Sequence, residues 1–162
     1  QKYKIMKIVL LTVGKTSQKN IEEEILLYSK RLSHYTDFEL QEIPSLKISA
    51  KISQSELKKS EGQMVMKYLN NSDYVVLLDE NGKSYSSIDF SKKIEKFMLN
   101  SFKRVVFVIG GAFGFSDELY SCCNEKLSLS KMTFSHQMVR LFFVEQLYRA
   151  FTIINNEKYH HQ

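Results

Sequence analysis

The sequence predicts one α/β domain built on a mostly parallel sheet. Apolar runs of strand length alternate with longer segments in which apolar residues recur at helical spacing. The 162 residues suffice for one sizeable core, and neither a linker nor an internal repeat divides them. The whole chain, residues 1–162, is therefore expected to form a single domain. The longest mostly apolar run, residues 8–13, is much shorter than the roughly 18 residues that a membrane span needs.

The first strand is expected at residues 5–13, where the apolar run is nearly continuous. Asn20 and Glu23 then have the spacing of a capping box, at the start of a helix whose apolar residues recur at helical spacing. Residues 38–43 alternate between apolar and polar, which indicates a second strand, and Pro44 ends it. This order of strand, helix and strand is typical of an α/β domain.

The middle of the chain continues the alternation. A polar segment up to about residue 54 is expected to be a loop, and apolar residues at helical spacing within 57–69 indicate the next helix. Residues 74–78 are expected to form the third strand. The Asn81-Gly82 pair that follows is typical of a turn.

The remaining elements follow in the same order. Ser86 is expected to cap a third helix, and residues 104–109 form a continuous run of apolar residues after an arginine, which predicts a strand buried on both faces. Ser116 is expected to cap a short helix. A fifth strand is expected at 127–129, and a long helix from residue 136 to about residue 155.

The composition favours a cytoplasmic protein that contacts polyanions. Cys122 and Cys123 are adjacent, which suits neither an ordinary structural disulfide nor a metal site, and is consistent with a reducing compartment. The start of the chain lacks the long apolar stretch and the cleavage site of a signal peptide. The net charge is +5, and residues 1–20 contain five lysines and no acidic residue, which fits contact with phosphate groups.

Several familiar motifs are excluded by their spacing. Segments 14–16 and 82–84 resemble the end of a phosphate-binding loop, but neither has the glycine that this motif needs five positions earlier. A dinucleotide-binding fold would place several glycines after the first strand, where only Gly14 occurs. No Gly-x-Ser-x-Gly segment is present to carry a hydrolase nucleophile.

Two segments in the last third are candidates for a binding site. Three of the six glycines lie between Gly110 and Gly114, directly after the strand expected at 104–109. Ligands of open α/β sheets bind beyond the carboxyl ends of strands, where glycine lets the backbone come close to them, although a tight turn would also use glycine. Residues 127–134, followed by His136, are either an edge strand with its loop or a segment whose backbone contacts a ligand.

The final helix is apolar on nearly every side between Val139 and Ile154. Such a helix is buried in its own core or against another subunit, and in a chain of this length we expect the interface of an oligomer. Arg140, Glu145 and Arg149 interrupt the apolar surface. Arg149 has the spacing to pair with Glu145, but arginine also suits partly buried sites that bind phosphate or carboxylate groups.

These features together resemble a known family. The segments that carry the resemblance are 78–83 with Ser86-Ser87, 107–114, 127–133 with His136-Gln137, 145–150, and Tyr159-His160. In this order and spacing they resemble the RlmH family, small enzymes of the SPOUT superfamily that methylate N3 of a pseudouridine in 23S rRNA. The resemblance covers the chain from Met6 onward, so residues 1–5 are expected to be an extension before the family's usual start.

The resemblance implies an α/β sheet with a C-terminal part threaded as a trefoil knot, and a homodimer. It implies S-adenosylmethionine as cofactor, no metal, and 23S rRNA of the assembled ribosome as substrate. The cofactor contacts that it implies are Leu78, Gly110, Gly111, Leu129, Ser130, Lys131, Met132, Thr133 and Phe134. Many relatives end in Tyr-His-Arg, whereas this chain has His161 in place of the arginine, so the resemblance implies no terminal guanidinium here.

The chemistry of this reaction assigns roles to the polar residues near the C-terminus. A sulfonium methyl donor needs no metal, but the attacking nitrogen must lose its proton. Histidine titrates nearest to neutral pH, so His136 and His160 are the candidates that accept or orient this proton. Tyr159 and His160 are expected to contact the base, and Arg149 or Arg140 to hold a phosphate. The competing interpretation is a loose, dispensable tail.

Two other functions compete with this one. A ribosome-associated factor without catalytic activity would explain the charge and the dimer, but not the glycine-rich segment 110–114. A nucleotide-dependent enzyme of flavodoxin-like topology would be expected to carry its phosphate loop after the first strand. Binding of S-adenosylmethionine, compared with binding of nicotinamide or flavin cofactors, separates the three.

Overall fold

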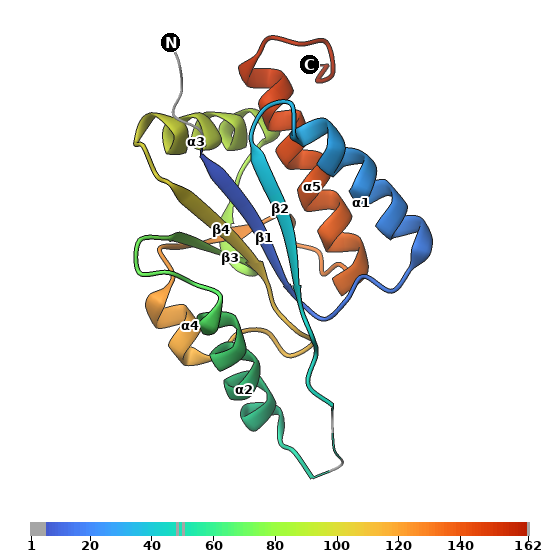
Figure 1. The fold of residues 1–162 in the computed structure, drawn as a ribbon, viewed down its shortest axis with the longest axis vertical. Helices are drawn as coiled ribbons and strands as arrows, with labels where there is room; N and C mark the ends of the chain where they lie inside the picture. The colour runs from blue at the N-terminus through green and yellow to red at the C-terminus, as the bar shows by residue number, and fades with distance from the viewer. Residues whose placement is uncertain (1–5, 48, 50, 162) are drawn as a thin grey trace.

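The structure, a computed structural model, describes residues 6–47, 49 and 51–161, so the expected extension at 1–5 lies outside the described residues. Five parallel strands form one sheet in the order β2-β1-β4-β3-β5 (Figure 1). The strands are β1 (Lys7–Val13), β2 (Asp37–Ile43), β3 (Tyr74–Ser84), β4 (Arg104–Ile109) and β5 (Glu125–Ser128). The predicted α/β class with a parallel sheet is confirmed. No helix among the described residues is long and apolar enough to cross a membrane.

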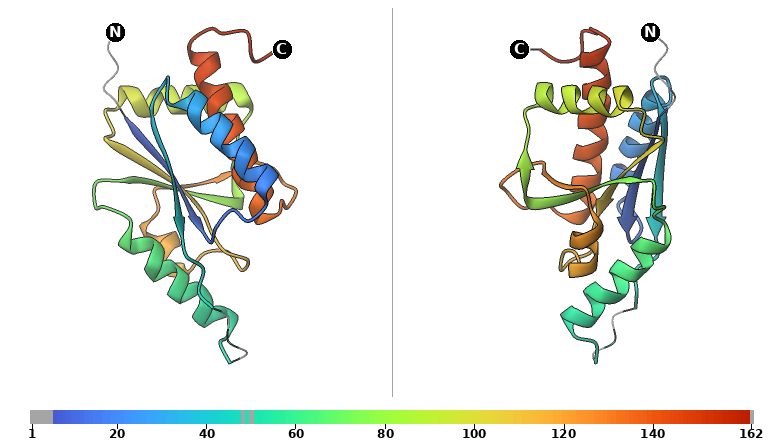
Figure 2. Two further views of the ribbon diagram at one scale, coloured as in Figure 1. Left: turned by 45° about the vertical axis from the view of Figure 1, so that its right-hand side comes forward. Right: turned by 90° about the vertical axis from the view of Figure 1, so that its left-hand side faces the viewer.

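Helices cover both faces of this sheet. They are α1 (Lys19–Leu32), α2 (Gln54–Lys67), α3 (Ser87–Leu99), α4 (Asp117–Cys122) and α5 (His136–Ile154). One core cluster joins α1, α3 and α5 to one face, and a smaller cluster joins α2 and α4 to the other. Both views of Figure 2 show α2 and α4 side by side, apart from the other three helices. The strand β4 lies between them with Val105 to Val108 fully buried, because its continuous apolar sequence suits a strand covered on both faces.

Two helix starts differ from the expected ones. The helix α1 begins at Lys19 with Gln18 as its N-cap, and no side chain caps it, so the capping box expected at Asn20 and Glu23 is wrong. The box occurs instead at α2, where the Ser53 side chain accepts from the Glu56 amide and the Glu56 carboxylate accepts from the Ser53 amide. Helical spacing predicted both helices, but a polar residue near the start of a helix can have the sequence pattern of an N-cap without capping it.

The Asn81-Gly82 pair is a bulge within β3 rather than the expected turn. Leu78 and Lys83 both pair with Leu127 of β5, so residues 79–82 project from the ladder. A Cβ at Gly82 would lie 2.6 Å from the backbone of Lys126 and of Leu127. Glycine therefore allows the bulge to pass directly against β5.

The final helix is not buried on all sides within a single chain. Phe143, Val144, Leu147, Ala150 and Phe151 are buried, whereas 39% of Phe142 is exposed and Val139 and Leu141 are half-buried. Contacts with α1 and α3 cover one side of α5. The exposed apolar side of α5 is the surface that the sequence pattern predicts to contact another subunit.

Candidate active site

A cavity of about 470 Å³ opens at the bulge of β3 and beyond the carboxyl ends of β4 and β5. This volume is within the usual range for a site that holds a small molecule. Its lining contains eight of the nine expected cofactor contacts, Lys131 being the exception, together with His136: Leu78, Gly110, Gly111, Leu129, Ser130, Met132, Thr133, Phe134 and His136. The segments after β4 and β5 thus meet at one site because parallel strands end at the same edge of the sheet.

The glycine-rich loop after β4 forms one wall of the cavity. The Gly114 amide donates to the Gly111 carbonyl at 3.2 Å, and Gly114 has a φ of +83°, which an L-residue rarely adopts. A Cβ at Gly110 would lie 3.0 Å from the ring of Phe115, which is buried. The packing of the loop on Phe115 therefore leaves little room for a side chain at position 110, apart from any approach of a ligand.

A buried carboxylate supports the same loop from the opposite side. Glu61 on α2 is 8% exposed, and a Cβ at Gly111 would lie 2.5 Å from its Oε2 atom. Burial raises the pKa of the Glu61 carboxyl above its ordinary value. The sequence did not indicate Glu61, because its role depends on the contact between α2 and the loop.

Two carboxylates line the cavity, and the sequence pattern did not indicate either of them. Asp79 and Glu80 belong to the bulge of β3; Tyr120 donates to Asp79, and the Thr133 hydroxyl donates to Glu80 at 2.9 Å. Burial raises the pKa of Tyr120, and its hydrogen bond to Asp79 raises it further, so its hydroxyl stays protonated. The sequence feature that could have indicated Asp79 and Glu80 is their position directly after Leu78, an expected cofactor contact. The cavity therefore offers negative charge to a cationic ligand.

Arg140 is placed in the interior and not at a substrate surface. Its side chain is 1% exposed, and burial lowers its pKa. Its donors reach the Val13, Gly14 and His136 carbonyls, the Thr16 hydroxyl and the Glu42 carboxylate, at 3.0–3.2 Å. The expected phosphate contact is corrected accordingly: this guanidinium joins α5 to the ends of β1 and β2 and has no face left for a phosphate.

The C-terminal tail folds back on the far end of α5. Tyr159 donates to Glu145 at 3.0 Å, and Arg149 pairs with Glu145, as their spacing predicts. An Arg149 Nη1 atom lies 3.3 Å from His160 Nδ1. Burial raises the pKa of Tyr159, so its hydroxyl remains protonated. The expected catalytic residues Tyr159, His160 and Arg149 therefore form one cluster, whereas His136 belongs to the cavity.

This cluster lies well away from the cavity of the same chain. His136 is the first residue of α5, and Arg149 follows it by 13 positions, which is about 20 Å along a helix. Figure 1 shows the C-terminus at the end of the molecule where β1 begins, opposite to the carboxyl ends of the strands. One chain alone does not bring the two groups of expected site residues together.

Comparisons with known proteins show the family of the chain. The family described as predicted SPOUT methyltransferase matches residues 6–160. The chain belongs to the SPOUT methyltransferase family. It is 55% identical over 157 residues, 97% of this chain and all of the relative, to "Ribosomal RNA large subunit methyltransferase H" of Christiangramia forsetii. It is 51% identical over the same shares to the protein of that name from Parabacteroides distasonis.

A solved structure shows the same fold at low identity. The probable methylase family protein from Haemophilus influenzae Rd KW20 matches 98% of this SPOUT methyltransferase with a TM-score of 0.52 and 14% identity, over 70% of its own chain. Within the described parts of the SPOUT chain, no group of three or more His, Cys, Asp or Glu side chains is placed to hold a metal ion.

Proposed function

We propose that this protein transfers a methyl group from S-adenosylmethionine to N3 of a pseudouridine in 23S rRNA, acting on assembled ribosomes in the cytoplasm. The observation that carries the proposal is the cavity over the 110–114 loop, which gathers most of the expected cofactor contacts in one place. The chain is also 55% identical to a relative named as a large-subunit rRNA methyltransferase. Neither competing function, a ribosome-associated factor or a flavodoxin-like enzyme, accounts for both facts.

The residues of the cavity fit S-adenosylmethionine. This molecule carries a positive sulfonium and an ammonium group, and the Asp79 and Glu80 carboxylates line the cavity. Leu78, Leu129 and Phe134 supply apolar walls, and the glycines of the loop let backbone groups come close. When bound, the cofactor supplies an electrophilic methyl group, so this chain's residues need only align the acceptor and remove its proton.

We propose that the C-terminal part is threaded as a trefoil knot. The support is the close passage of the β3 bulge over β5, where Gly82 leaves no room for a side chain above the backbone of Lys126 and Leu127. After β5 the chain runs along the cavity and enters α5. This helix packs between α1 and α3 on one face of the sheet.

We further propose a homodimer in which two α5 helices run antiparallel. Antiparallel pairing about a two-fold axis places the last turns of one α5 beside the first turns of the other. The tail of one chain would then reach the cavity of its partner, which the 20 Å along α5 prevents within a single chain. The exposed Phe142 and the α1 residues Leu26 and Leu27, which are 61% and 43% exposed, offer apolar area for such an interface.

The contacts of the tail and the lining of the cavity support different proposed roles for the two histidines. A guanidinium has no acceptor, so Arg149 must donate to His160 Nδ1, which places the ring proton on Nε2. His160 is then a donor, suited to hydrogen-bond a carbonyl oxygen of the base as N3 loses its proton. His136 is exposed, lines the cavity, and is the histidine that accepts the proton. Protonated Tyr159 positions the base and does not act as the proton acceptor.

Cofactor binding and methyl transfer test this function together. Calorimetry should detect S-adenosylmethionine, and labelled methyl groups should pass to ribosomes that lack the modification, but much less to free 23S rRNA. No binding at millimolar cofactor would refute the enzyme and favour the ribosome-associated factor. Binding of a flavin or nicotinamide cofactor instead would favour the flavodoxin-like alternative.

A further inference from the structure

Arg31, in the last turn of α1, is unlike the other arginines of the chain. The sequence has four arginines, and three of them pair with a carboxylate: Arg104 with Asp73, Arg140 with Glu42 and Arg149 with Glu145. No carboxylate among the described residues pairs with Arg31. Its charge is therefore available to a ligand.

Two tyrosines hold the Arg31 guanidinium in place. The Cζ atom lies 5.3 Å from the centre of the Tyr28 ring and 5.6 Å from that of Tyr148, within the range of a cation–π contact. Tyr28 belongs to α1 and Tyr148 to α5, so the contact spans the two helices. A guanidinium ordered in this way loses little freedom when it binds, and its planar donors match a phosphate in two places at once.

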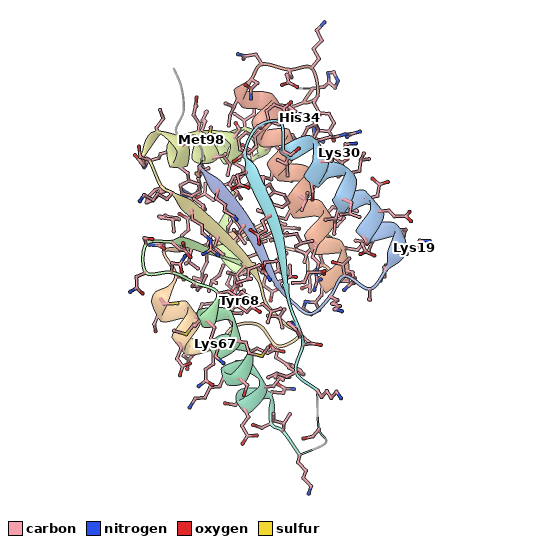
Figure 3. The ribbon with its side chains drawn as sticks, in the orientation of Figure 1. Lys19, Lys30, His34, Lys67, Tyr68 and Met98 are labelled. Carbon is pink, nitrogen blue, oxygen red and sulfur yellow. The ribbon has the colours of Figure 1, made fainter. Side chains whose placement is uncertain are left out.

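The same tyrosines connect Arg31 to the tail. The ring centres of Tyr148 and Tyr159 are 4.8 Å apart, and the Tyr28 and Tyr159 hydroxyls are 3.4 Å apart. Only the ring of Tyr148 thus lies between Arg31 and Tyr159. Figure 3 shows its neighbours Lys30 and His34 at the same end of the molecule as the C-terminus, where both are exposed. Lys30 and Arg31 therefore place two positive charges at this end of the molecule, and no carboxylate among the described residues pairs with either of them.

We propose that Arg31 binds a backbone phosphate of the rRNA, on a nucleotide next to the one that Tyr159 and His160 contact. The proposal rests on the proposed function, because it takes the tail as the part that meets the target base. Phosphate contacts fix the position of a nucleic acid without reading its sequence. Arg31 would therefore determine how tightly the ribosome is held, and not how fast the methyl group moves.

The test compares two variants of Arg31 with a control on the opposite face of the sheet. Arg31→Gln removes the charge, Arg31→Lys retains it without the planar guanidinium, and Lys67→Gln removes one charge from the exposed end of α2 (Figure 3). Ribosome binding is measured by sedimentation at several salt concentrations, and methyl transfer is measured in parallel. Oligomeric state, melting temperature and cofactor affinity are recorded for each variant.

Arg31→Gln should weaken ribosome binding and raise KM roughly tenfold at low salt, leave kcat and cofactor affinity unchanged, and make the dependence of log Kd on log salt shallower by about one unit. Arg31→Lys should keep the steeper salt dependence and recover part of the affinity. Lys67→Gln should behave as the wild type. Unchanged ribosome binding in Arg31→Gln would overturn the proposal, as would monomer formation or loss of cofactor affinity. If the wild type binds ribosomes but transfers no methyl, the proposed function fails, whereas the binding data still decide the role of Arg31.

Discussion

Replacement of Arg140 by Met should lower the stability of the protein without acting directly on the substrate. The guanidinium donates to three backbone carbonyls, the Thr16 hydroxyl and the Glu42 carboxylate, and Met can replace none of these contacts while filling a similar volume. Removal of one partner from a buried ion pair costs about 3–5 kcal/mol, because it leaves the other groups unpaired. For a chain of this size each kcal/mol lowers the melting temperature by roughly 2–4 °C, so a fall of about 10 °C is expected.

Thermal unfolding followed by circular dichroism measures this effect, with Arg31→Met as the matched control because Arg31 has no carboxylate partner among the described residues. The control should melt within a few degrees of the wild type. The opposite pattern would refute the assignment: an unchanged melting temperature for Arg140→Met, together with a raised KM for ribosomes, would return Arg140 to the substrate contact that the sequence suggested.

Three further substitutions test other contacts. Gly110→Val should abolish cofactor binding because its side chain would displace Phe115 and with it the loop, and a normal cofactor affinity by calorimetry would contradict this. Glu61→Gln should raise the melting temperature at pH 7–8 and leave it unchanged near pH 4. Because burial raises the pKa of Glu61, the favourable contribution of its carboxyl to the free energy of unfolding is complete below its ordinary pKa and is lost as pH rises through the raised pKa. An equal change in melting temperature at every pH would disprove the link between the protonation of Glu61 and stability. Phe142→Asp should produce folded monomers in light scattering, and a stable dimer would exclude this surface as the interface; Phe143 and Leu147 are unsuitable for this test because both are buried in the core of the chain.

The sequence predicted the elements whose formation depends on local pattern. The continuous apolar run of β4 and the helical spacing of α1 and α2 located these elements correctly, because burial on one or both faces requires those patterns. The glycine loop at 110–114 was found because a ligand site in an α/β sheet lies where strands end.

The remaining features depend on contacts between distant segments, which one sequence does not display. Arg140 in an apolar helix fits a phosphate site and a buried ion pair equally well, and only the position of Glu42 on β2 decides between them. The bulge at 79–82 has the composition of a turn, and its pairing with β5 makes it part of a strand. The sequence shows Glu61 only as a polar residue on a helix, and its contact with the 110–114 loop is visible only in the structure.

The central claim is that the cavity of one chain and the tail of the other form a single active site. Two variants test it directly: a chain without residues 159–162, and a full-length chain with Gly110→Val in its cavity. Each alone should transfer methyl groups to ribosomes at less than about a tenth of the wild-type rate, a loss of about 1.4 kcal/mol or more in transition-state stabilisation. Mixed in equal amounts and allowed to exchange subunits, they should recover about a quarter of the wild-type activity, because half of the dimers then contain one complete site. No recovery in mixed dimers of demonstrated composition, or full activity of the chain without its tail, would contradict the account.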